Sequence, residues 1–232
     1  MLKVPLAFSG IPIKGVNNPI LVLFADFKES PILSGTLSSE FFETFKEATG
    51  FSCKKAEEII SKERYPIPFS SYYIFASKRY IDLSTELCDL PINEDEKFEI
   101  LNLIDDALFD SSLIKALRTA QKNNHSLLYR EGEEPVLIEA SGLELKYLGY
   151  FPLTEDIRYI DDALIHLSGT LVLDFVTSFS EKLIDVENSL WDLIYGLKVP
   201  YIASKLKWIW DDKYASIVEI INLPNILSPG VQ

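Results

Sequence analysis

The chain of 232 residues has the composition of a packed globular protein, with 47% hydrophobic and 12% aromatic residues, which excludes an intrinsically disordered chain. Its 35 acidic residues outnumber its 22 Lys and Arg residues, so the net charge is −13. A negative field of this sign opposes general binding to nucleic acid and to anionic membranes, and it permits a basic protein partner.

The chain shows no signal for a membrane span or for secretion. No run approaches the roughly 20 apolar residues that cross a bilayer, and the N-terminus lacks the long apolar core of a signal peptide. Cys53 and Cys88 stand at unrelated positions and are expected to be free, buried thiols in a reducing compartment. These features predict a soluble protein of the cytoplasm.

Two strands and a helix are predicted first along the chain. Apolar and polar residues alternate over 11–16, and the continuous apolar run 20–27 has the length of a strand buried on both faces. Large apolar residues then recur at helical spacing within 33–47. Ser34 or a hydroxyl just after it is expected to cap this helix, and Gly50 to end it.

The first part of the chain is completed by a short helix at about 54–62 and by a strand pair over 72–77 and 80–90. This order of elements is β-β-α-α-β-β. A helical segment follows, in which Asn93 and Glu96 have the spacing of a capping box.

The last part repeats the same outline. Segments 136–140 and 143–150 flank Ser141-Gly142, which suits the two-residue turn of a hairpin. A helix bearing Leu171, Phe175 and Phe179 is expected next. Segments 206–210 and 215–223 would be the closing strands.

One phrase occurs twice, as LSGTLSSEFFETFKE over 33–47 and as LSGTLVLDFVTSFSE over 167–181, with eight of fifteen positions identical. Weaker matches flank it at nearly constant spacing and predict a duplicated unit of about 84 residues. We therefore expect an α+β fold with two β-β-α-α-β-β units, within 1–91 and 131–232, packed about a pseudo-two-fold axis. The segment 92–130 would be a helical bridge between them.

Each copy carries a Ser-Gly-Thr triplet, Ser34-Gly35-Thr36 and Ser168-Gly169-Thr170, at the expected start of a helix. Hydroxyls and free backbone donors at a helix start can hold an anion. The pattern predicts a small anionic ligand where the two triplets converge. The alternative is a helix cap with a tight turn.

Two sets of residues could support catalysis. Arg118 and His125 are separated by six residues, a spacing that resembles the Arg-x4–6-His pattern of the HEPN ribonucleases. That resemblance implies transition-state stabilisation and proton transfer, whereas the alternative is an ordinary exposed Arg and His at a helix end. Glu139, Glu144 and Lys146 flank the expected hairpin turn and resemble the acidic-x-Lys core of the PD-(D/E)xK nucleases, which implies metal-assisted cleavage. The alternative is an exposed, charged sheet face.

A basic and aromatic stretch predicts a partner-binding surface. All three tryptophans, Trp191, Trp208 and Trp210, lie close together in the sequence, and mixed aromatic and basic residues can form a binding site. Strand alternation should place Trp208 and Trp210 on a face that is mostly core, and Lys205 and Lys207 on the opposite, exposed face. The lysines expected to bind the partner are Lys198, Lys205, Lys207 and Lys213.

The preferred prediction is a non-catalytic binding or scaffold protein with a protein partner and without a cofactor. The polar residues shared by the two copies are turn, cap and hydroxyl types, with no acid–base pair among them. Only two histidines are present, which disfavours a His-based metal site. The alternatives are a nuclease, either HEPN-like or metal-assisted, and a sensor of a small anionic ligand.

Overall fold

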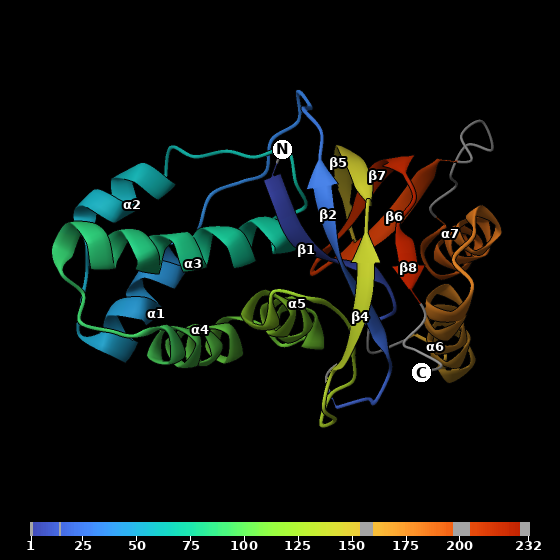
Figure 1. The fold of residues 1–232 in the computed structure, drawn as a ribbon, viewed down its shortest axis with the longest axis horizontal. Coiled ribbons are helices and arrows are strands. Elements are labelled where there is room, and N and C mark those ends of the chain that lie inside the picture. The colour runs from blue at the N-terminus through green and yellow to red at the C-terminus, as the bar shows by residue number, and fades with distance from the viewer. Residues whose placement is uncertain (1, 14, 154–159, 197–204, 228–232) are drawn as a thin grey trace.

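The computed structural model describes residues 2–13, 15–153, 160–196 and 205–227. Over these residues the chain forms seven helices and eight strands, so the predicted α+β class is confirmed. The strands form one curled sheet, with α1 to α5 on one side and α6 and α7 on the other (Figure 1).

The strands are β1 (Leu2–Ser9), β2 (Ile20–Phe27), β3 (Ser126–Tyr129), β4 (Val136–Ser141), β5 (Glu144–Pro152), β6 (Leu206–Asp211), β7 (Tyr214–Asn222) and β8 (Asn225–Leu227). The helices are α1 (Ser39–Thr49), α2 (Lys54–Ile60), α3 (Phe69–Cys88), α4 (Glu94–Leu108), α5 (Ser112–Asn123), α6 (Asp162–Thr177) and α7 (Glu181–Tyr195).

Strand β2 is the centre of the sheet. The strand order is β6-β7-β5-β2-β3-β4-β8, and β1 pairs along the other edge of β2. The first half of β2 pairs with β3, and its last two residues pair in parallel with β5. Because β1 also lies against β6, the sheet curls. The expected burial of β2 on both faces is confirmed, since the residues of its first half are all inaccessible to solvent.

Local helix signals are confirmed where the sequence carries them. The Glu96 N–H donates to Asn93 Oδ1 at 3.0 Å and the Asn93 N–H donates to Glu96 Oε2 at 2.8 Å, which is the expected capping box. Gly50 ends α1 in the left-handed conformation, at φ 68°. Phe41 and Phe175 are both fully buried, as their helical spacing predicts.

The predicted strand pair over 72–77 and 80–90 is wrong, because this segment is the helix α3. Its tyrosines and Ile74 favour a strand when they are considered alone. In the fold, however, Tyr73, Tyr80 and Ser84 recur at helical spacing and are buried, so tertiary packing overrides the local preference. The first part of the chain therefore ends in a helix.

Two other strand predictions are wrong. The described residues 11–13 and 15–16 are not in a strand, and the strand β1 instead occupies Leu2–Ser9. Strands β4 and β5 do not pair with each other around Ser141-Gly142. Strand β4 pairs with β3 and β8, whereas β5 pairs with β2 and β7, so the chain turns a corner between them.

The architecture does not confirm the duplicated unit or the pseudo-two-fold axis. Strands β1 and β2 form a direct antiparallel pair, but their counterparts β4 and β5 are not neighbours. The second Ser-Gly-Thr triplet also lies inside α6 rather than at its start, because Asp161 caps that helix well upstream of the triplet. Strands from all three predicted segments, 1–91, 92–130 and 131–232, share the sheet.

The cysteines correct another expectation. Cys53 and Cys88 form a disulfide and are not free thiols. Helices α2 and α3 pack together, which brings the residue before α2 within 6.0 Å (Cα to Cα) of the last residue of α3. Among the helices of the described residues, none combines the length and the apolar character needed to cross a membrane.

Candidate ligand-binding cleft

The start of helix α3 is anchored by a residue from the far end of the chain. Asp211, the last residue of β6, accepts the Phe69 N–H at 2.8 Å and the Ser70 N–H at 2.6 Å. A carboxylate is favourable here because helix starts carry free N–H groups and a partial positive charge. Burial raises the pKa of Asp211, and these donors, together with the Ser216 hydroxyl, counteract that effect.

A cleft of about 940 Å³ opens beside this anchor, between the helices and the sheet. It is lined by the 33–40 segment, the start of α3, the α4–α5 connection, β5 and the β6–β7 turn. This volume is within the range of ligand pockets in proteins. Eight aromatic residues contribute to the lining, namely Phe69, Tyr72, Tyr73, Phe109, Tyr147, Tyr150, Trp210 and Tyr214.

Three of these rings form an aromatic corner, defined as Phe69, Tyr150 and Tyr214. The Tyr150 and Tyr214 rings meet edge to face, with centroids 5.0 Å apart and planes at 75°. Phe69 approaches Tyr214 in the same manner, at 6.4 Å and 66°. Tyr150 is 57% exposed, so part of the corner is open to solvent and to a ligand.

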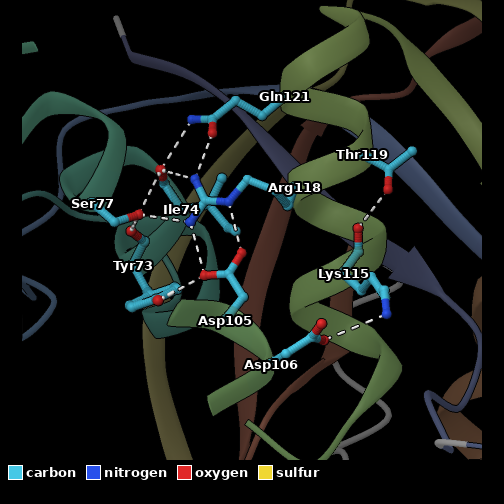
Figure 2. A network of polar contacts seen from close by, with 9 residues as sticks. All are labelled: Tyr73, Ile74, Ser77, Asp105, Asp106, Lys115, Arg118, Thr119 and Gln121. Atoms are coloured by element: carbon cyan, nitrogen blue, oxygen red, sulfur yellow. Dashed lines mark hydrogen bonds and ion pairs between the residues drawn. The ribbon is translucent and has the colours of Figure 1, made fainter. Parts of the chain in front are cut away.

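Another part of the lining is fixed by a buried polar network (Figure 2). The Tyr73 hydroxyl donates to Asp105 Oδ1 at 2.7 Å, and Arg118 Nε donates to Asp105 Oδ2 at 2.8 Å. The same guanidinium donates to Ser77 Oγ at 2.8 Å and to Gln121 Oε1 at 2.7 Å. Burial, followed by the Asp105 charge, raises the pKa of Tyr73, so this phenol stays protonated.

The first Ser-Gly-Thr triplet lies on the wall of the cleft but does not cap a helix. The Ser34 hydroxyl and N–H both donate to the Tyr65 carbonyl, at 2.8 and 2.7 Å. Ser38 is the cap of α1, since its hydroxyl accepts the Phe41 N–H. Gly35 faces open space. Ser34, Gly35 and Thr36 line the cleft, so the predicted contact of these residues with a ligand has a place in the structure.

The second triplet is in a different environment. Ser168, Gly169 and Thr170 lie in the middle of α6, across the sheet from α1 (Figure 1). Gly169 packs so closely against the segment before β2 that an added Cβ would lie 2.8 Å from Asn18 Oδ1. The expectation that the two triplets converge on one ligand is therefore wrong.

The charges of the cleft are predominantly acidic. Among the residues that the structure describes, its lining contains the carboxylates of Glu40, Asp110, Asp211 and Asp212, and one cation, Lys213. Asp212 occupies the turn between β6 and β7 with φ at 58°. Burial raises the pKa of Asp212, and the neighbouring Lys213 counteracts this effect. An anionic ligand would be repelled by this lining.

The lysines of the predicted partner-binding surface do not share one environment in the fold. Lys205 and Lys213 are exposed as expected, and Lys198 lies outside the described residues. Lys207, however, is fully buried and pairs with Glu187 of α7, while its ammonium lies 4.7 Å from the Phe8 ring centroid. The expectation that Lys207 is exposed is wrong because β1, which contributes Phe8, and α7, which contributes Glu187, pack against β6 and cover this side chain.

The nuclease candidates do not assemble as predicted. Arg118 is buried in the network above and is not a surface residue, while His125 lines a second cleft of about 1060 Å³. Glu139 also lines this second cleft. Glu144 lies instead at the start of β5, where its carboxylate pairs with the Lys28 ammonium at 3.1 Å. Lys146, also on β5, lies opposite Glu219 of β7. Among the described residues, no group of three His, Cys, Asp or Glu side chains is arranged to hold a metal ion.

Comparison with known proteins adds no relative: no family model matches the chain, and no curated protein and no solved structure is significantly similar to it. The cleft is therefore assigned from its geometry. Sequence reasoning did not single out Tyr73, Asp105 or Asp211. The local excess of aromatic residues was the available signal, since it includes Trp210 and Tyr214 of the lining.

Proposed function

We propose that the protein is a non-catalytic binding protein that receives a basic segment of a partner protein in the aromatic cleft. The observation that carries this proposal is the part of the lining that the structure describes, in which eight aromatic side chains and four carboxylates accompany one lysine. Aromatic faces attract cations through their quadrupole. Carboxylates add charge complementarity, which favours one class of partner and accelerates encounter.

The state of the polar groups supports binding rather than catalysis. The Asp211 carboxylate is engaged by the start of α3, and the Tyr73 hydroxyl is engaged by Asp105. The described lining residues include no His and no Cys, the side chains that most often transfer protons or attack substrates near neutral pH. The acidic lining is also unfavourable for nucleic acid, whose phosphates carry the same sign of charge.

The proposal does not depend on a duplicated unit. The disulfide changes the cellular compartment that we expect for the protein. The disulfide between the buried Cys53 and the half-buried Cys88 favours an oxidising compartment over the reducing cytoplasm, because cytoplasmic proteins rarely keep structural disulfides. The nuclease alternative has weaker support, since the buried Arg118 cannot reach a substrate.

The test is a titration of fluorescently labelled peptides followed by anisotropy. Peptides rich in Lys and Arg should bind, and a Glu-rich peptide of equal length should not. Tyr150→Ala should weaken binding at least about tenfold, because it removes an open face of the corner. Phe151→Ala is the matched control: Phe151 is similarly exposed, at 48%, but it points to the other face of β5 and contacts Trp208.

Two results would contradict the proposed function. One is the absence of binding by every peptide rich in Lys and Arg. The other is an equal loss of affinity in the Tyr150 and Phe151 variants, which would place the binding surface elsewhere. Melting temperatures of both variants should be close to that of the wild type.

A further inference from the structure

We propose that the group recognised in the cleft is the guanidinium of an arginine side chain, an inference that rests on the proposed function. The first observation is that two of the three helix starts that line the cleft, those of α1 and α3 but not that of α5, already hold carboxylates of this chain. Asp211 occupies the start of α3, and Glu40 lies in the first turn of α1 behind the Ser38 cap. The positive ends of α1 and α3 are therefore compensated, and the cleft offers acceptors for a cation.

The second observation is the aromatic corner of Phe69, Tyr150 and Tyr214. Its rings stand nearly perpendicular to one another, so a ring face is left beside each edge-to-face contact. A guanidinium is planar and weakly hydrated and stacks on such faces, whereas the lysine ammonium is a compact, strongly hydrated charge that loses more on leaving water. The corner therefore favours arginine over lysine at equal charge.

The third observation is the supply of carboxylates in the cleft that contains the rings. Glu40 and Asp212 line the same cleft, and the β6–β7 turn fixes the backbone of Asp212 in the left-handed conformation. A carboxylate accepts two parallel N–H bonds from a guanidinium, a geometry that an ammonium cannot reproduce. Stacking and forked hydrogen bonds together specify a side chain with a flat, multiply donating cation.

The decisive experiment compares peptides that differ in one central side chain: arginine, lysine, trimethyllysine or citrulline. We expect arginine to bind about tenfold more tightly than lysine, and citrulline to bind weakly because it keeps the shape without the charge. Equal affinity for arginine and lysine would overturn this inference and leave the proposed function standing. Tightest binding by trimethyllysine would also overturn it, in favour of a cage for methylated ammonium. If no cationic peptide binds, both proposals fail.

A pair of conservative variants tests the carboxylates directly. Asp212→Asn combined with Glu40→Gln removes both charges, and Asn tolerates the left-handed backbone at position 212. We expect the preference for arginine over lysine to fall below about threefold, since the forked bonds are lost. Asp162→Asn with Glu181→Gln is the control, because it removes equal charge from α6 and α7 across the sheet. A full preference for arginine in the Asp212 and Glu40 variant would overturn the inference.

Discussion

Arg118 and Lys115 lie one turn apart on α5, and each pairs with a neighbouring aspartate of α4, but they differ in burial (Figure 2). The Arg118 and Asp105 side chains are 1% and 6% exposed, against 49% and 60% for Lys115 and Asp106. Arg118→Met should lower the free energy of unfolding by about 3–5 kcal/mol, because it leaves a buried carboxylate unpaired. Lys115→Met should change it by less than about 1 kcal/mol. Urea unfolding measures both, and a near-neutral Arg118→Met would show that Asp105 finds another partner.

The buried tyrosines predict how stability responds to alkaline pH. Burial raises the pKa of Tyr72 and of Tyr129 to about 12, and it also raises the pKa of Tyr147. Unfolded tyrosines ionise near pH 10, so the unfolded state releases protons first. The contribution of these tyrosines to the free energy of unfolding is therefore fully present below about pH 10, and it is lost as the pH rises toward 12. Absorbance at 295 nm should show fewer phenolates at pH 11 in the native protein than in urea.

At the scale of single elements, the two glycines of the repeated phrase provide a matched pair. Gly169→Ala in α6 places a Cβ against Asn18 and Pro19, which should cost about 1–3 kcal/mol. This cost exceeds the gain in helix propensity, which is at most about 1 kcal/mol. Gly35→Ala meets no atom within 4 Å and should be nearly neutral. Equal effects of the two substitutions on the melting temperature would contradict this account of their environments.

Elements with short-range signals were predictable from the sequence, and those with distant determinants were not. Asn93 and Glu96 sit on the same turn, so the start of α4 was correctly expected. Helix α3 was missed because its anchor, Asp211, is 141 residues from Ser70 and no local pattern points to it. The repeated phrase misled for a different reason: α6 starts at the Asp161 cap and runs through its triplet, whereas the triplet of the first copy lies before α1.

At the scale of the whole molecule, the disulfide gives a prediction about redox conditions. It joins residues separated by 35 positions, and closing such a loop stabilises a protein by about 2–4 kcal/mol. Reduction with dithiothreitol should therefore lower the melting temperature, and Cys53→Ser with Cys88→Ser should lower it by a similar amount. Reductant should have no further effect on the double variant. An unchanged melting temperature in reductant would mean that the bond contributes nothing to stability.

The candidate cleft was only partly predictable at this scale. The triplet at 34–36 and the aromatic stretch that contains Trp210 and Tyr214 were both singled out, but nothing indicated that they meet. They meet because β6 and β7 join the sheet beside β5, on the far side of β2 from β3 and β4. Strand order of this kind is set by packing over the whole chain, which residue patterns within one segment do not encode.

The central position of β2 has a consequence for biosynthesis. Its Phe24 N–H donates to Ser126, 102 residues later in the chain. Its last two residues pair with β5, which follows β3 and β4 in the chain. At about 5–20 residues per second, translation takes roughly 5–20 s to supply the first of these partners. During that interval the nascent chain carries a finished apolar strand with an unpaired edge, a feature that favours aggregation. The helices between them, α1 to α5, are complete before β3 emerges, and we expect them to shield β2 on the ribosome.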